Sequence, residues 1–277
     1  MNPQETGRTI SLLRKEAGLT QAALAEALEV SDKAVSKWER GIACPDISLL
    51  PKLSILLDTD IEGLLNGEAI VGRYKWKGVL LLDEYASRYV YSKPMVYYLL
   101  QYFLLVGIRD ILIVNGDVKS ILGTGEQLGI RLSYTTTHFS EAVLQSIDDS
   151  NSNLLIVFGN ILIYGANLTR KLQGAMFHAS DTVIMKTDTG MRLPILFLPH
   201  KEIERLRNKR FNRIDDMVKA LQPTEKAFAR GTVAIPMNDK DEMLSACHFV
   251  RVIEQNEGRE IANLEEISLN RGLIRSK

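Results

Sequence analysis

The stretch TQAALAEALEVSDKAVSKWERG, from Thr20 to Gly41, predicts two short helices joined by a tight turn. Thr20 and Ser31 are residue types that favour helix N-caps, and each begins a run with apolar residues at helical spacing. Gly41 can adopt the left-handed conformation that ends a helix. The apolar positions are Ala23, Leu24, Ala27 and Leu28 in the first run, and Val35 and Trp38 in the second. The two helices should therefore cross steeply about a turn at Glu29 and Val30.

The second helix of this pair is expected to project outward with a polar face. Its outward positions are Asp32, Lys33, Ser36, Lys37 and Arg40. A helix whose first turn is polar and short-chained can enter the DNA major groove by its N-terminal end. The same spacing would also suit an amphipathic helical hairpin with no role in DNA binding.

The span from Gly7 to Gly67 resembles the helix-turn-helix domains of the Cro/C1/XRE repressor family. The resemblance is carried by Gln21, Val30–Ser31, the string SKWERG from Ser36 to Gly41, and Pro45. It implies an all-α, five-helix domain over residues 1–67 that binds a double-stranded DNA operator. The first helix should run from about Thr9 to Ala17, and DISLLPKLSILLDTDIEGLL should hold the fourth and fifth.

The same resemblance assigns DNA contacts to six side chains, which are Gln21, Ser31, Lys33, Ser36, Lys37 and Arg40. Gln21 is expected to meet a phosphate, whereas Lys33, Ser36 and Lys37 are expected to face base edges. Repressors of this family commonly work as dimers, so the resemblance also implies a homodimer on two half-sites.

Charge gives this domain no general attraction for DNA. Residues 1–68 hold seven Lys and Arg against eleven Asp and Glu, a net charge of −4. Affinity for DNA should therefore come from a local patch of Lys33, Lys37 and Arg40. Arg14 and Lys15 are candidates to extend this patch. Each neutralised phosphate adds counterion-release free energy, so we expect modest, strongly salt-dependent binding that dimerisation improves.

The chain as a whole is long enough for two domains, with 277 residues and 34 basic against 34 acidic side chains. The N-terminus is polar and does not resemble a signal peptide. The most apolar stretch, Met95 to Val106, is too short to span a bilayer. Cys44 and Cys247 lack the spacing of a disulfide framework or a zinc site. These features predict a reducing, cytoplasmic setting, with no membrane and no metal site.

A second domain is expected over residues 76–277, after the breaker Asn66-Gly67 and a short linker over residues 68–75. Strand-like runs alternate there with helical stretches. The expected strands are KGVLLLD, DILIVN, RLSYTT, NLLIVFGN and DTVIMKT, and the expected helices span Pro94 to Val106, Glu141 to Ile147 and Ala166 to Ala175. Leu/Ile/Val-rich strands separated by helices predict a doubly wound α/β fold whose mostly parallel sheet is covered on both faces.

This second region resembles the sugar-phosphate nucleotidyltransferases, and glucose-1-phosphate thymidylyltransferase most closely. An ordered set of strings carries the resemblance: KGVLL from Lys77, SKPMVYYLL from Ser92, LVGIRDILIV from Leu105, GEQLGIRLSY from Gly125, LLIVFGNILIYGANL from Leu154, and GREIANLEEISLNRGLI near the C-terminus. The resemblance implies a shortened nucleotidyltransferase-like fold, with nucleotide and sugar phosphate bound beyond the carboxyl ends of the strands.

The residues that this chemistry needs are missing. Active members of the family cradle phosphates in a glycine-rich loop after the first strand, whereas this chain has Asp83, Glu84 and Tyr85 there. The resemblance puts Asn160 and Pro236 at the two positions where the family has magnesium-binding aspartates.

The segment that bears the family's catalytic lysine has no counterpart between Arg88 and Lys93. The resemblance leaves Arg88, Gln145 and Asn160 as possible ligand-binding residues. Without the loop, the lysine and the metal ligands, catalysis by the family mechanism is not expected.

We therefore expect a transcriptional regulator whose C-terminal domain is a pseudoenzyme without a cofactor. That domain would dimerise the DNA-binding domains, sense a nucleotide or sugar nucleotide, or do both. Two alternatives stay open: an active sugar-1-phosphate nucleotidyltransferase with a DNA-binding appendage, and a protein-interaction scaffold.

Overall fold

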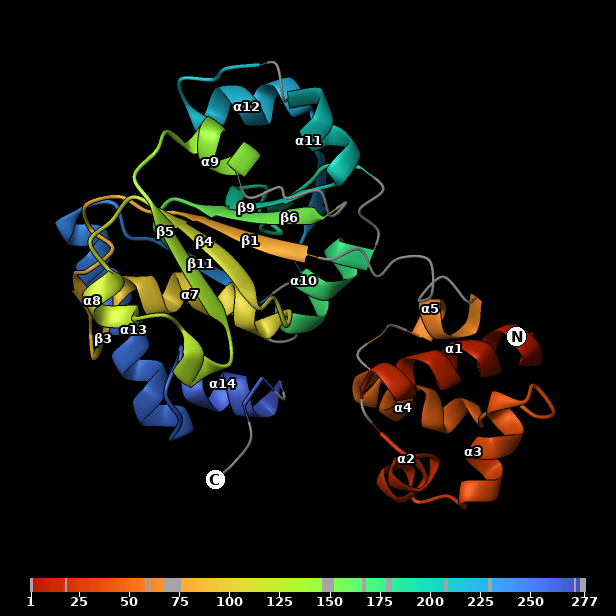
Figure 1. Ribbon diagram of the computed structural model, residues 1–277. Coiled ribbons are helices and arrows are strands. Elements are labelled where there is room, and N and C mark those ends of the chain that lie inside the picture. Colours follow the sequence, from red (N-terminus) through yellow and green to blue (C-terminus); the bar gives the residue numbers. More distant parts are fainter. Residues whose placement is uncertain are drawn as a thin grey trace. The chain divides into compact units, whose positions relative to one another are not determined.

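The structure, a computed structural model, describes residues 2–17, 19–57, 59, 61–66, 76–145, 152–165, 168–177, 181–206, 209–228, 231–271 and 273–274. The chain divides into two compact units, Met1–Arg73 and Tyr74–Lys277, which are treated separately below (Figure 1). The linker expected over residues 68–75 lies outside the described residues.

The N-terminal unit is all-helical, as predicted. It contains α1 (Pro3–Glu16), α2 (Gln21–Leu28), α3 (Asp32–Glu39), the 3-10 turn η1 (Ile47–Leu49), α4 (Leu50–Leu56) and α5 (Ile61–Asn66). The first helix begins at Pro3, earlier than the expected Thr9. The side chain of Asn2 accepts a hydrogen bond from the Gln4 backbone N–H at 3.1 Å. Pro3 fills the first helical position, where the missing N–H costs nothing.

The two helices of the predicted hairpin have the expected caps. Thr20 Oγ1 accepts from Ala23 N at 3.0 Å, and Ser31 Oγ accepts from Ala34 N at 3.2 Å. Glu29 ends α2 in the left-handed region, with φ of 59°. Leu24 and Leu28 of α2 are buried, as are Val35 and Trp38 of α3. The apolar spacing therefore fixes which face of α3 is turned inward.

Helix α1 approaches the end of α3 closely. A Cβ atom at Gly7 would lie 1.9 Å from the carbonyl oxygen of Trp38, so only glycine fits at this point of α1. The chain then leaves α3 through Gly41, whose φ is 69°. These contacts set the position of α3 on the rest of the unit.

The C-terminal unit is built on a seven-stranded sheet with the order β10-β8-β9-β6-β1-β4-β5. The strands are β1 (Trp76–Leu81), β4 (Asp110–Val114), β5 (Arg131–Thr135), β6 (Asn153–Phe158), β8 (Val183–Lys186), β9 (Arg192–Leu198) and β10 (Thr224–Ala227). Strand β1 runs parallel to both neighbours, with Leu80 opposite Ile113 and Val157. Strand β9 is antiparallel to β6 and β8. The sheet is thus mostly parallel, as predicted, with one inserted antiparallel strand.

Two small antiparallel pairs lie beside this sheet. They are β2 (Tyr89–Val90) with β3 (Lys93–Pro94), and β7 (Ile161–Tyr164) with β11 (Val233–Pro236). The longest helix of the unit, α13 (Lys240–Glu257), packs against β2 and β11.

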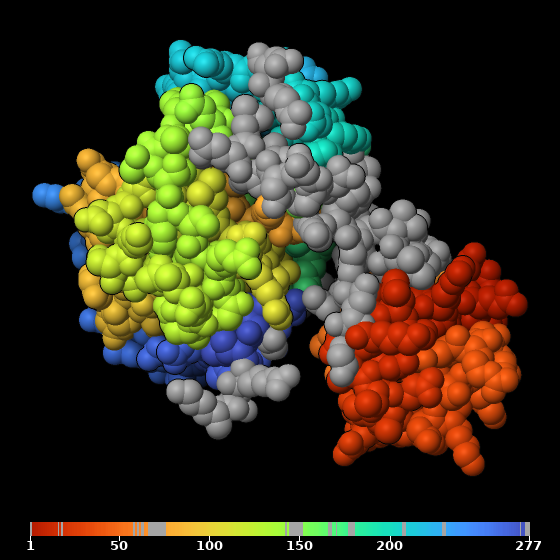
Figure 2. All heavy atoms as spheres, in the orientation of Figure 1, coloured from red at the N-terminus to blue at the C-terminus, as the bar shows by residue number. Residues whose placement is uncertain are grey.

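Helices cover both faces of the large sheet (Figure 1), and in the space-filling view the cyan side chains of residues 200–206 and 209–221 close over one side of the unit (Figure 2). One face carries α7 (Met95–Leu105), α10 (Leu168–Phe177) and α14 (Leu264–Asn270), and the other carries α9 (Phe139–Gln145), α11 (His200–Leu206) and α12 (Ile214–Leu221). Neighbouring strand residues alternate between the two cores: Leu80 packs in the first and Val79 in the second. This arrangement confirms the predicted doubly wound α/β fold.

Within the described ranges, no helix combines the length and the apolar character that crossing a membrane requires.

Candidate nucleic-acid interface and strand-end site

The outer face of α3 is cationic and open. Lys33, Lys37 and Arg40 are exposed, and Ser36 is half-buried. In the part of the chain that the structure describes, none of the three cations forms an ion pair. Because Val35 and Trp38 anchor the opposite face, the three charges remain available on one side of a rigid helix. The geometry suits contacts with phosphates and base edges.

Two other predicted DNA contacts have intramolecular partners. Ser31 caps α3 through its hydroxyl oxygen. Gln21 begins α2, and its Nε2 donates to Glu39 Oε2 at 2.8 Å. This bond holds the amide group of Gln21 at the N-terminus of α2, so the residue is oriented before any ligand arrives.

Glu39 is also bound by Arg14 in a buried ion pair between α3 and α1. Arg14 Nε donates to Glu39 Oε1 at 2.5 Å, and Nη2 donates to Oε2 at 3.0 Å. Arg14 Nη1 donates to the Leu19 carbonyl oxygen at 2.6 Å. The two side chains are only 9% and 6% exposed. Arg14 therefore faces inward, and the expectation that it adds to the DNA-contacting patch is wrong; Lys15 is exposed.

The ion pair keeps both groups charged. Burial raises the pKa of the Glu39 carboxyl, but the hydrogen bonds from Arg14 and Gln21 outweigh burial and leave this pKa below its ordinary value. The hydrogen bond to Glu39 raises the pKa of Arg14. A charged pair in this place ties α1, the α1–α2 loop and α3 together.

A second candidate site lies at the carboxyl ends of β1 and β6, where nucleotides bind in related folds. Asn160 Nδ2 donates to Asp83 Oδ2 at 2.5 Å. The other Asp83 oxygen accepts from the Tyr85 backbone N–H at 2.8 Å. Asn160 is buried, and its backbone carbonyl accepts from Met237 N at 2.9 Å. Asp83, in the place of the expected phosphate loop, and Asn160, in the place of an expected metal ligand, are thus hydrogen-bonded to each other.

The other predicted ligand-binding residues differ in what surrounds them. The guanidinium of Arg88 lies 4.3 Å from the ring centre of Tyr85, in the loop after β1, and is exposed. Gln145 is the last residue of α9, and its side chain lies outside the described part of the structure.

The strand-end site does not fit a magnesium ion. Pro236 pairs with Ile161, directly after Asn160, so the two positions with aspartates in the family lie side by side. They hold a proline and an amide, and the amide turns its NH₂ group toward Asp83. Mg²⁺ is usually held by one or two carboxylates together with phosphate oxygens and waters, and the Asp83 carboxylate already accepts hydrogen bonds from Asn160 and from the Tyr85 N–H. Among the described residues, no group of three or more His, Cys, Asp or Glu is placed to hold a metal ion.

Lys93 is a structural residue rather than a free lysine at this site. Its Nζ donates to the Ile261 carbonyl oxygen at 3.0 Å and lies 3.0 Å from a Glu260 carboxylate oxygen. The side chain is 12% exposed and also approaches Glu254 at 3.7 Å. Lys93 therefore links β3 to the C-terminal helical region.

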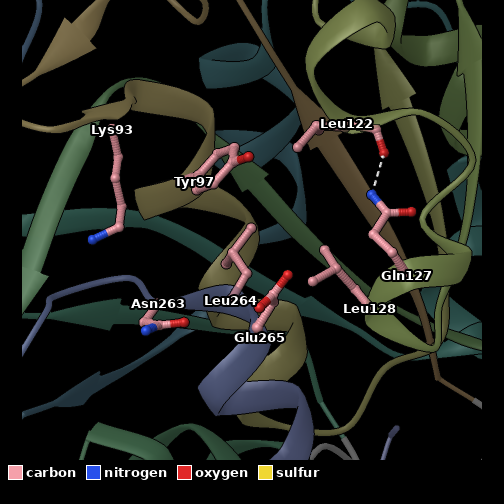
Figure 3. A pocket seen from close by; sticks show the side chains of 8 residues that line it. All are labelled: Lys93, Tyr97, Leu122, Gln127, Leu128, Asn263, Leu264 and Glu265. Carbon is pink, nitrogen blue, oxygen red and sulfur yellow. Dashed lines mark hydrogen bonds between the residues drawn. The ribbon is translucent and has the colours of Figure 1, made fainter. Parts of the chain in front are cut away.

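A separate hollow of about 180 Å³ lies between α7, η2 (Glu126–Leu128) and α14. Figure 3 shows its lining residues, Lys93, Tyr97, Leu122, Gln127, Leu128, Asn263, Leu264 and Glu265. Gln127 Nε2 donates to the Leu122 carbonyl oxygen across one wall at 2.9 Å. Small-molecule pockets usually measure about 300–1,000 Å³, so this hollow is small for a nucleotide.

Known proteins resemble each unit in turn. Residues 10–64 match a family model described as Helix-turn-helix. The HTH-type transcriptional activator BcrR of Enterococcus faecalis is 39% identical over 67 residues, which cover 24% of this chain and 33% of that protein. The first unit is therefore a helix-turn-helix domain of the Cro/C1 type.

The second unit is similar to glucose-1-phosphate thymidylyltransferases. The enzyme of Neisseria meningitidis is 36% identical over 96 residues, 31% of this chain and 33% of that protein, so this chain spans about a third of its length. The enzyme of Mycolicibacterium smegmatis is 25% identical over 233 residues, 67% of this chain and 81% of that protein. A Bacillus anthracis structure assigned to the same enzyme class matches with a TM-score of 0.54 and 12% identity over 64% of this chain and 95% of that one.

The class of protein is therefore a two-domain chain that joins a helix-turn-helix domain to a nucleotidyltransferase-like fold. Its C-terminal region is homologous to glucose-1-phosphate thymidylyltransferases.

Proposed function

We propose that this protein is a DNA-binding transcriptional regulator whose C-terminal domain has lost nucleotidyltransferase catalysis. The C-terminal domain joins two chains into a dimer, so that two copies of α3 bind the two half-sites of an operator. A nucleotide or sugar nucleotide that binds to this domain would act as an effector.

The observation that carries the regulatory role is the open cationic face of α3. Lys33, Lys37 and Arg40 are exposed on a helix whose inner face is anchored by Trp38. The domain around them is net acidic, so its attraction to DNA is concentrated on this face. Two copies of the face on one duplex double the number of neutralised phosphates, which favours a dimer.

The loss of catalysis is supported by the bond between Asn160 and Asp83. A phosphate at this position would have to approach the Asp83 carboxylate, whose hydrogen-bond partner in the structure is the Asn160 amide and not a cation. The alignment with the Mycolicibacterium enzyme runs over 233 positions but uses only 67% of the 277 residues of this chain, so the enzyme has segments without a counterpart here.

Two measurements on the full-length protein test the C-terminal assignment. With Mg²⁺, dTTP or UTP, and glucose 1-phosphate, we expect no pyrophosphate release above the level without protein. A thermal-shift series with nucleotides and sugar nucleotides separates the two remaining roles, because a ligand that binds only the native state raises its melting temperature. Stabilisation by one ligand supports sensing. Pyrophosphate release would restore the enzyme alternative.

Lys37→Ala should weaken binding to the operator more than it weakens binding to unrelated DNA. The reason is that Lys37 lies on the outer face of α3, where a good base contact contributes about 1–3 kcal/mol of discrimination. Fluorescence anisotropy with both duplexes at several salt concentrations measures the two losses.

Lys219→Ala serves as the matched control, because it removes an exposed lysine from α12 of the other unit. Equal losses on operator and unrelated DNA would show that Lys37 touches only the phosphate backbone.

A further inference from the structure

Asp32 places a carboxylate at the leading end of the proposed reading helix. It is the first residue of α3 and is exposed, as are Lys33 and Lys37. The N-terminal residues of a recognition helix come closest to the bases. A carboxylate there approaches a polyanion, and it is repelled unless a base edge offers it a hydrogen-bond donor.

The folded domain does not use Asp32 as the cap of α3. Ser31 makes the capping bond to Ala34 N, while Asp32 Oδ1 accepts from the adjacent Lys33 N–H at 2.7 Å. Among the described residues, no lysine or arginine forms an ion pair with Asp32. The bond to Lys33 N holds the carboxylate at the helix start, and its second oxygen can face a ligand.

The major-groove edges of the four bases differ in how they suit a carboxylate. Cytosine presents its N4 amino group as a donor, and carboxylates accept from it. Adenine presents a donor at N6 beside an acceptor at N7, a pattern that an amide side chain matches better than a carboxylate. Guanine presents two acceptors, and thymine presents an acceptor and a methyl group, so both leave the charge of Asp32 uncompensated.

We propose that Asp32 reads a cytosine in each operator half-site and rejects sites without it, an inference that rests on the proposed DNA-binding function. The donors of Lys33 and Lys37 suit guanine, whose O6 and N7 are both acceptors. The outer face of α3 therefore combines an acceptor for cytosine with donors for guanine and selects a G·C-containing core.

Site selection from a randomised duplex library tests this assignment with the full-length wild type and three variants. Asp32→Asn and Asp32→Ala alter the proposed contact. Glu26→Gln is the charge control, because it also removes one negative charge from an exposed helical residue of the same domain. The wild type and Glu26→Gln should enrich cytosine at one position of each half-site. Asp32→Asn should enrich adenine at that position, because asparagine pairs with adenine N6 and N7.

Binding to single duplexes gives the size of the effect. Replacing the selected C·G pair by T·A should weaken wild-type binding about tenfold, and the same replacement should have little effect on Asp32→Ala. If both Asp32 variants select the wild-type sequence and keep its cytosine preference, the assignment of Asp32 is wrong while DNA reading stands. If the wild type enriches no sequence, the proposed function fails, and the assignment fails with it.

Discussion

Glu39→Ala is expected to lower the free energy of unfolding of the N-terminal domain by about 3 kcal/mol. The substitution leaves the buried guanidinium of Arg14 with the Leu19 carbonyl as its remaining partner and removes the acceptor of Gln21. A domain of this length has only roughly 5 kcal/mol of stability, so much of it should be lost. Urea unfolding followed by Trp38 fluorescence in a Trp76→Phe background measures the change, since these are the two tryptophans of the chain.

Lys52→Ala provides the control for the loss of Glu39. It breaks another ion pair of the same domain, to Glu29, but both of these side chains are well exposed, so little stability should be lost. The double substitution Arg14→Met with Glu39→Leu should recover most of the loss, because it removes the uncompensated charge. A Glu39→Ala protein as stable as Lys52→Ala would contradict the role of the buried pair.

Asn160→Asp is expected to destabilise the C-terminal domain by about 3 kcal/mol at neutral pH. It replaces a donating amide by a second carboxylate beside Asp83, at a buried position. Two carboxylates in contact force one of their pKa values up by about two units, which corresponds to this free energy. The raised pKa belongs to the folded state, so the penalty is present at neutral pH and is relieved as the pH falls through that pKa. Thermal unfolding followed by Trp76 fluorescence at pH 7 and pH 4 measures both effects.

Asn238→Asp is the matched control for this change. Asn238 Nδ2 also donates to a carboxylate, Glu242 Oε2 at 3.0 Å, but Asn238 is exposed, so solvent screens the new charge. Added Mg²⁺ should recover part of the stability of Asn160→Asp, because a cation can bridge the two carboxylates, and it should leave the control unchanged. If the two substitutions lower the stability equally, the buried contact of Asn160 with Asp83 does not contribute more to stability than an exposed contact.

The sequence predicts the helix-turn-helix unit well because local signals agree there. Thr20 and Ser31 are caps whose partners lie three residues away, and Val35 and Trp38 repeat at helical spacing. The direction in which the Arg14 side chain points does not depend on its neighbours in the sequence. Its partner Glu39 lies 25 residues further on, and only the packing of α1 on α3 brings them together.

The C-terminal unit shows the same division between local and distant signals. Its parallel strands β1, β4, β6 and β8 are near-continuous apolar runs, and the sequence predicts them; the parallel edge strand β10, with the polar sequence TEKA, gives no such signal. Strand β9 is not predicted either, since it contains Pro194 and lies antiparallel between strands that come earlier in the chain. Asp83 and Asn160 are each recognisable as departures from the enzyme pattern. That they bond to each other across 77 residues follows only from the adjacency of β1 and β6.

Gly7 contacts the carbonyl of Trp38 on the inner side of α3, away from the residues on its exposed face. The helix is held through backbone at Trp38, through Glu39 and through the buried side of Val35, and none of these groups points toward solvent. Asp32, Lys33 and Lys37 can therefore be exchanged without disturbing the support beneath them. Substitutions on the exposed face of α3, in evolution or by design, could thus change a DNA-sequence preference without changing the fold, as long as residue 7 stays a glycine.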